Sequence, residues 1–242
     1  MVIQVFENEQ QVAKAGAAII AAQILAEPQS VLGLATGSTP IELYKELVKL
    51  YDDGVISFAE VTSFNLDEYL GIDRHHDQSY FRFMVDNLFS KINILPDSIH
   101  IPDGTAVDPQ AECERFEEAI ADANYIDLQL LGLGRNGHIG FNEPNSFFQK
   151  ATHVTDLAED TITANARFFE TDAEVPRQAI SMGIGTIMEA GRILLLATGV
   201  GKAEAVKAMV EGHIDPLCQA SILQIHPDVT ILLDQEAASL LN

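Results

Sequence analysis

Short apolar runs alternate along the chain with longer segments in which apolar residues recur at helical spacing. The apolar runs predict strands at residues 2–6, 31–35, 61–65, 126–133, 193–197 and 229–233. The longer segments predict helices at residues 10–26, 41–51, 78–89, 109–122 and 202–211. This alternation is typical of a mostly parallel sheet with helices on both faces. Because no linker, repeat or low-complexity run interrupts it, we predict a single α/β domain over residues 1–242.

The composition narrows the class of protein. Of 242 residues, 47% are hydrophobic, which is enough for a core. The 36 acidic and 14 basic residues give a net charge of −22, which argues against a nucleic-acid partner. Cys113 and Cys218 form no CxxC pair, so neither zinc nor a disulfide framework is predicted. The chain shows no signal-peptide pattern and no apolar stretch near the ~20 residues of a membrane span. We therefore expect a cytoplasmic enzyme that does not bind membranes.

Ligands of open α/β sheets bind beyond the carboxyl ends of the strands, so the loops there are the place to look for chemistry. The loop after residues 31–35 reads TGSTP. Gly37 allows a tight turn, and Ser38 and Thr39 supply hydroxyl and N–H groups at a helix start, where anions bind. An equally plain alternative is a well-capped helix without a ligand.

An acidic protein that binds a phosphate must place its few cations deliberately, so each basic residue beside a glycine turn is informative. Lys202 follows Gly199 and Gly201 at the predicted start of a helix, where the helix dipole opposes a cation. A bound anion would reverse that effect, although the side chain could also point into water. Arg167 is a candidate third contact to the same phosphate, or a surface arginine.

The segment GLGRNGHIGFNEP matches the GxGxxG dinucleotide fingerprint, but its context disagrees. The residues that follow Gly137 include a glycine and Pro144, which do not start a helix. A tight turn that exposes Asn136, His138 and Glu143 is the better interpretation. His138 can exchange protons near neutral pH, Glu143 can orient its ring, and Asn136 can hold a sugar hydroxyl or the imidazole. A merely polar surface loop is the alternative, and the set is too sparse to predict a metal.

Asp67 falls at the predicted carboxyl end of residues 61–65. A partly desolvated carboxylate there can abstract a proton next to a carbonyl or imine. Glu68 is adjacent, so it points the other way in extended geometry. The alternative is a pair of solvated acids, as is common in an acidic protein.

Together these segments resemble the glucosamine-6-phosphate deaminase family. The matching stretches occur in family order over most of the chain: LGLATGSTP, FNLDEYLG, LGLGRNGHIGFNEP, NARFF, VPRQAISMGIGTIMEA and GVGKAEAVKAMVEG. The resemblance implies a Rossmann-like fold and conversion of glucosamine 6-phosphate to fructose 6-phosphate and ammonia. We accordingly class the activity as that of a hydrolase acting on an amino-sugar phosphate.

The resemblance also implies roles for the candidate residues. His138 would open the sugar ring with help from Asn136 and Glu143, and Asp67 would move a proton from C2 to C1. The phosphate would be held by the remaining candidates, which are Gly37, Ser38, Thr39, Arg167 and Lys202. No cofactor and no metal are implied, because the substrate's own amine and carbonyl accept the electrons. The sequence does not decide between a monomer and a homo-oligomer.

Two departures from the family pattern affect these expectations. Many members carry Asp where this chain has Asn136. The enterobacterial type is activated by N-acetylglucosamine 6-phosphate through basic residues, and this chain has His153, Thr155 and Asp156 in that stretch. We therefore predict no such activation.

Two rival functions are also compatible with the sequence. A 6-phosphogluconolactonase-like hydrolase shares the fold and a GxxGH-type loop, but resembling sequences differ after the histidine. A non-catalytic sugar-phosphate sensor would tolerate loss of His138 and Asp67, and both are present here.

Overall fold

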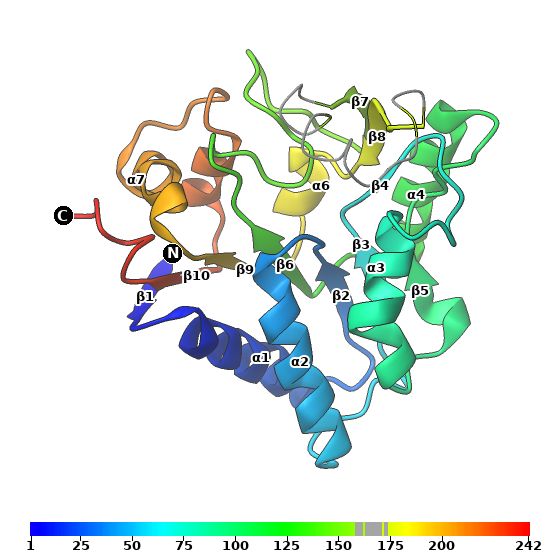
Figure 1. Ribbon diagram of the computed structural model, residues 1–242, viewed down its shortest axis with the longest axis horizontal. Helices are drawn as coiled ribbons and strands as arrows, with labels where there is room; N and C mark the ends of the chain where they lie inside the picture. Colours follow the sequence, from blue (N-terminus) through cyan, green and yellow to red (C-terminus); the bar gives the residue numbers. More distant parts are fainter. Residues whose placement is uncertain (158–161, 163–170, 172–173) are drawn as a thin grey trace.

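The computed structural model describes residues 1–157, 162, 171 and 174–242. Within them, parallel strands form one seven-stranded sheet in the order β1-β10-β9-β6-β2-β3-β5 (Figure 1). The strands span Val2–Phe6 (β1), Val31–Leu34 (β2), Thr62–Asn65 (β3), Ile99–His100 (β5), Leu128–Gly132 (β6), Arg192–Ala197 (β9) and Val229–Asp234 (β10). The predicted mostly parallel α/β fold is therefore confirmed.

Helices connect these strands on the two faces of the sheet. They are Glu9–Ala26 (α1), Thr39–Asp52 (α2), Tyr80–Asn87 (α3), Pro109–Asp122 (α4), Ile184–Met188 (α6) and Ala203–Glu211 (α7), and short 3₁₀ turns cover Phe89–Lys91, Pro96–Ser98, Val200–Lys202 and Gln219–Ile225. Connections through α1, α2 and α3 run across the sheet towards β5, and those through α4, α6 and α7 run back towards β1. Since such crossovers are right-handed, the two groups cover opposite faces.

The chain changes direction across the sheet between β2 and β6, which are neighbours. The helix that follows β2 and the segment that follows β6 therefore leave on opposite faces, and a crevice opens between the two loops. β9 lies on the other side of β6, so its carboxyl end reaches the same crevice.

A second, antiparallel sheet of three strands covers the edge of the main sheet at which its strands end. This second sheet was not predicted from the sequence. It has the order β4-β8-β7, with β4 at Asp67–Tyr69, β7 at His153–Asp156 and β8 at Gln178–Ser181. β4 begins two residues after β3 ends, so it stands directly beyond the main sheet (Figure 1). The Ser181 hydroxyl accepts a hydrogen bond from the Phe141 N–H at 3.0 Å and ties the loop after β6 to this sheet.

The core lies between the main sheet and its helices. The central strands are buried except for Gly132 and Arg192 at the ends of β6 and β9, as expected for parallel strands covered on both faces, and their burial is continuous rather than alternating. Helix α1 is rich in alanine and packs against α2 and β10. None of the described helices is both long enough and apolar enough to cross a membrane.

Candidate active site

A cleft lies in the crevice between the loops that follow β2 and β6, and contains about 730 Å³ of empty space, part of it open to solvent. Loops from four different strands, together with α3, contribute to its lining. The residues that line the cleft include Thr36, Gly37, Ser38, Thr39, Asp67, Tyr80, Gly134, His138 and Lys202.

The loop after β2 presents unused hydrogen-bond donors to the cleft. Gly37 has a φ of 95°, a left-handed conformation that suits glycine. The Ser38 hydroxyl makes no capping hydrogen bond to α2, so the alternative of a plain helix cap does not describe it. The backbone N–H groups of Gly37, Ser38 and Thr39 donate to no other group in the described part of the chain. Such a loop at a helix start is suited to an anion.

The loop after β9 contributes positive charge, and two of its N–H groups are already used within the fold. Asp234 accepts the N–H of Gly199 at 2.9 Å, and Glu236 accepts that of Val200 at 3.2 Å, so these two donors are occupied. Lys202 immediately precedes α7, as the sequence predicts, and is half-buried. Burial lowers the pKa of Lys202, and the nearby charge of Arg135 lowers it further. The ammonium group is thus the main attraction for an anion at this end of the cleft.

Asp67 is a buried carboxylate, 6% exposed, at the bottom of the cleft. Its Oδ1 atom is buried and has no hydrogen-bond partner among the described residues. Burial, and secondarily the charge of Glu68, raises its pKa to about 8. A carboxyl group with this pKa takes up and releases protons close to neutral pH, as a general acid–base group must.

Glu68 is equally buried but fully used in structure. Its carboxylate accepts the N–H groups of Tyr69, Tyr80 and Phe81, each at 2.9 Å. Two of these N–H groups belong to the first turn of α3, so Glu68 holds the start of that helix. The sequence prediction that Asp67 and Glu68 point in different directions agrees with these contacts.

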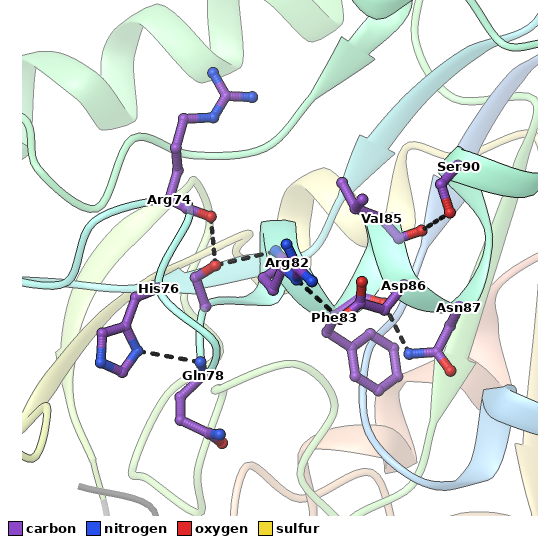
Figure 2. Close-up of polar contacts among 10 residues, drawn as sticks. Arg74, His76, Gln78, Arg82, Phe83, Val85, Asp86, Asn87 and Ser90 are labelled. Carbon is purple, nitrogen blue, oxygen red and sulfur yellow. Dashed lines mark hydrogen bonds and ion pairs between the residues drawn. The ribbon is translucent and has the colours of Figure 1, made fainter. Parts of the chain in front are cut away.

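The start of α3 is also capped by Ser79. Figure 2 shows this region, with Arg74, Gln78 and Arg82 labelled. The Ser79 hydroxyl accepts the Arg82 N–H at 3.0 Å and donates to the Arg74 carbonyl. In the loop before it, His76 accepts the N–H of Gln78 at 3.1 Å. This cap places Tyr80 at the wall of the cleft, where its hydroxyl donates to that of Tyr69 at 3.1 Å.

His138, Glu143 and Asn136 form a connected group on the turn after β6. The Nδ1 atom of His138 lies 3.1 Å from Glu143 Oε1, and Asn136 Nδ2 donates to Glu143 Oε2 at 2.7 Å. No hydrogen bond to any other described residue occupies His138 Nδ1, so Glu143 is its neighbour in this group. Burial raises the pKa of Glu143, but the approach of His138 and the Asn136 hydrogen bond outweigh it, and the net pKa is lowered. Glu143 is thus an anion beside the imidazole.

The glycines of the GxGxxG match shape this turn. Gly134 donates its N–H to the His138 carbonyl at 2.9 Å, and a Cβ at Gly134 would lie 2.4 Å from the imidazole ring. Gly137 has a φ of 83° and closes the turn by donating to the Gly134 carbonyl at 3.0 Å. No helix follows it in residues 138–152. The turn is the support of His138, and its form differs from a dinucleotide-binding strand–turn–helix.

The structure brings most of the predicted site residues to one cleft. Arg167 lies outside the described residues. Asn136 and Glu143 do not line the cleft but contact the group that does, His138. Sequence reasoning missed Thr36 and Tyr80, which line the cleft, and Arg135, whose charge acts on Lys202. Arg135 is a basic residue between two glycines, the very signal that singled out Lys202.

Fold and cleft together define an α/β protein with a phosphate-suited loop, a buried acid–base carboxyl and a histidine at the carboxyl edge of one sheet. The family described as glucosamine-6-phosphate isomerases/6-phosphogluconolactonase matches residues 7–230, and the chain belongs to this family. It is 50% identical to glucosamine-6-phosphate deaminase of Alkaliphilus oremlandii over the whole of both chains. It is 51% identical to glucosamine-6-phosphate deaminase of Halothermothrix orenii, again over the whole of both chains.

Solved structures support the same placement. A monomeric glucosamine-6-phosphate deaminase superposes with a TM-score of 0.95 at 45% identity, covering 99% of this chain and 100% of the other. A 6-phosphogluconolactonase from Trypanosoma cruzi has a TM-score of 0.78 at 20% identity, covering 100% of this chain and 97% of the other, which shows a shared fold alone.

These relatives correct one expectation. The classification of the activity as a hydrolase is wrong, because the full-length relatives are deaminases and the family description names isomerases of the amino-sugar phosphate. These names describe an isomerisation and the loss of an amine, and neither describes the reaction as cleavage of a bond by water.

Proposed function

We propose that the protein is a glucosamine-6-phosphate deaminase that converts its substrate to fructose 6-phosphate and ammonia. The observation that carries the proposal is Asp67, a buried carboxyl with an unpartnered oxygen and a pKa raised to about 8, in the same cleft as the loop after β2 and His138. The family relationship supports the choice of substrate.

The reaction begins with ring opening. His138 takes the proton from the C1 hydroxyl and delivers a proton to the ring oxygen, so the C1–O5 bond breaks and an open-chain aldehyde forms. Glu143, held by Asn136, stabilises the protonated imidazole that exists between the two transfers. Because the imidazole ring of His138 lies against Gly134, the position of the imidazole is fixed during both proton transfers.

Asp67 then carries out the isomerisation. Its carboxylate takes the proton from C2 while the substrate's ammonium group passes a proton to the C1 oxygen, which gives an enolamine with a C1 hydroxyl. Asp67 then returns its proton to C1, which leaves a protonated imine at C2. Water adds to that imine carbon, ammonia leaves, and the C2 ketone of fructose 6-phosphate remains. The substrate's ammonium group beside Asp67 favours the ionised carboxyl, so binding itself supports formation of the base.

The phosphate is placed by the two loops at the other end of the cleft. The N–H groups of Gly37, Ser38 and Thr39 donate to its oxygens, and the Lys202 ammonium supplies charge. Arg167 completes the set in the proposal, on the strength of the family resemblance. No cofactor or metal takes part in these steps.

We also propose that N-acetylglucosamine 6-phosphate does not activate the enzyme. His153, Thr155 and Asp156 line a second pocket, and its other described lining residues include Glu143 but neither Lys nor Arg. Burial lowers the pKa of His153, so that side chain favours its neutral form. A phosphate would meet only negative or neutral side chains there. A hyperbolic rate curve that this compound leaves unchanged is expected.

The test is release of ammonia and fructose 6-phosphate from glucosamine 6-phosphate. The Asp67→Asn variant should lose about a thousandfold in kcat, since a positioned general base contributes about 10²–10⁴. Asp122→Asn, at the exposed end of α4, is the matched control and should keep full activity. Absence of ammonia with the wild type would refute the function. An Asp67→Asn enzyme of normal kcat would refute the role of the base alone, and lactone opening without ammonia would favour the 6-phosphogluconolactonase reaction.

A further inference from the structure

Arg135 occupies an unexplained position beside the cleft. It follows Gly134 in the turn that carries His138, and its side chain lies against the loop after β9. A Cβ added at Gly201 would be 3.5 Å from Arg135 Nε and 3.8 Å from its guanidinium carbon. The guanidinium group therefore packs on the backbone next to Lys202, although it comes from a different strand end.

The two cations are close together, and neither has an ion-pair partner among the residues that the structure describes. In the described part of the chain, neither Arg135 nor Lys202 forms an ion pair, whereas Arg82, Arg115 and Arg192 do. Carboxylates outnumber basic residues 36 to 14, so partners are abundant in this protein. Two adjacent positive charges without a carboxylate repel each other, and a bound anion between them removes that repulsion.

We propose that Arg135 binds the phosphate of the substrate from the solvent side, opposite the N–H groups of the loop after β2, and shares it with Lys202. This inference rests on the proposed function for the identity of the substrate. A guanidinium suits the task because it donates two parallel hydrogen bonds to a phosphate. Its exposure lets it reach a phosphate as the substrate enters.

The position of Arg135 in the chain gives its contact with the phosphate a second consequence. Arg135 is one residue from Asn136 and three from His138 in a turn closed by Gly134 and Gly137. A phosphate held by Arg135 therefore orders the turn that carries the ring-opening histidine. Arg135 is a substrate-binding residue in this proposal, and it selects sugars that carry a dianion.

The experiment compares Arg135→Gln, Arg135→Lys and the control Arg192→Gln. Arg192 lies at the opposite end of β9 and pairs with Asp228 at 3.3 Å, so its replacement removes the same charge away from the cleft. Arg135→Gln should raise KM for glucosamine 6-phosphate about tenfold or more, because it removes a charge-assisted contact. The inhibition constant of inorganic phosphate should rise by a similar factor. Arg135→Lys should recover part of both losses, and Arg192→Gln should show neither.

The competing explanation is that Arg135 only attracts the substrate to the cleft over a long range, without contacting its phosphate. Measurements at high salt concentration distinguish this explanation from direct binding. A rise in KM that disappears in 0.5 M KCl, with unchanged phosphate inhibition, would overturn the proposal, because screening removes only long-range attraction. An unchanged KM in Arg135→Gln would do the same. Calorimetric binding of inorganic phosphate to wild type and Arg135→Gln tests Arg135 without turnover. Failure of the proposed reaction is thereby distinguished from failure of this contact.

Discussion

Asp67 and Glu68 are neighbours on β4, both buried, and they differ in what surrounds their oxygens. Glu68 accepts three backbone N–H groups, and Asp67 has an Oδ1 atom without a partner. One carboxylate is therefore satisfied by the fold, and the other is kept for a group that is not part of the fold. Two residues of similar chemistry and equal burial thus separate into a structural and a reactive role, and hydrogen bonding makes the difference.

The largest effect expected from this contrast is that of Asp67→Asn on the stability of the protein. The pKa of Asp67 is raised from 3.8 to about 8 in the folded protein. Between these values the unfolded state has lost the proton that the folded state keeps, so the wild type loses stability as pH rises through this window. Asparagine has no such dependence. The gain in free energy of unfolding of Asp67→Asn over wild type should grow by about 3 kcal/mol between pH 5.5 and pH 8.

Urea unfolding at the two pH values measures this gain. Asp122→Asn removes an exposed carboxylate from the end of α4, and its difference from wild type should be the same at both pH values. A constant difference for Asp67→Asn as well would show that Asp67 is not held in a desolvated environment, and the contrast with Glu68 would disappear.

Glu68→Gln should have the opposite sign and a smaller size. The variant retains one acceptor oxygen, and its NH₂ group faces at least one backbone N–H of the α3 start, most directly that of Phe81. The expected loss is about 2 kcal/mol, because a buried donor is left without a partner. Ser79→Ala removes the ordinary N-cap of the same helix and should cost about 1 kcal/mol. Should Glu68→Gln cost no more than Ser79→Ala in urea melts, Glu68 would have no special part in holding α3.

The contrast between the two acids also shows how far sequence reasoning reaches. The buried strands and long helices were predictable because parallel strands and amphipathic helices leave strong patterns of apolar residues. The position of Asp67 at the carboxyl end of a strand could be predicted from the same patterns. The second sheet was not predictable, because its strands have three or four residues and Asp67 pairs with Ser181, far along the chain. The cap made by Glu68 was hidden for the same reason: its partner Tyr80 is twelve residues away.

The predicted phosphate loops show a similar division. The glycine turns around Ser38 and Lys202 were visible as local motifs, whereas the contacts between loops were not. That Asp234 and Glu236 occupy the N–H groups before Lys202 depends on β10 lying beside β9. Arg135 met the criterion of a basic residue in a glycine turn, but only the adjacency of β6 and β9 brings it to Lys202.

The smallest expected effect is the influence of Glu68 on the pH profile of Asp67. Burial is the main reason why the pKa of Asp67 is raised, and the charge of Glu68 is the second. The proposed base is active when ionised, so kcat/KM of the wild type should fall about tenfold per pH unit on the acidic side of its pKa. Glu68→Gln removes the like charge and should move this acidic limb to lower pH, which gives about a threefold higher kcat/KM than wild type at pH 6.5 when both are scaled to their maxima.

Profiles from pH 5.5 to 9 with the same substrate test this shift, since titration of the substrate's own groups cancels in the comparison. Ser79→Ala loosens the same helix without changing charge and should keep the wild-type limb. If Glu68→Gln and Ser79→Ala shift the limb equally, the movement of α3 is the cause and the charge of Glu68 is not. If only Glu68→Gln shifts it, the structural acid also tunes the reactive one, and the two sides of β4 are coupled through charge while they remain distinct in hydrogen bonding.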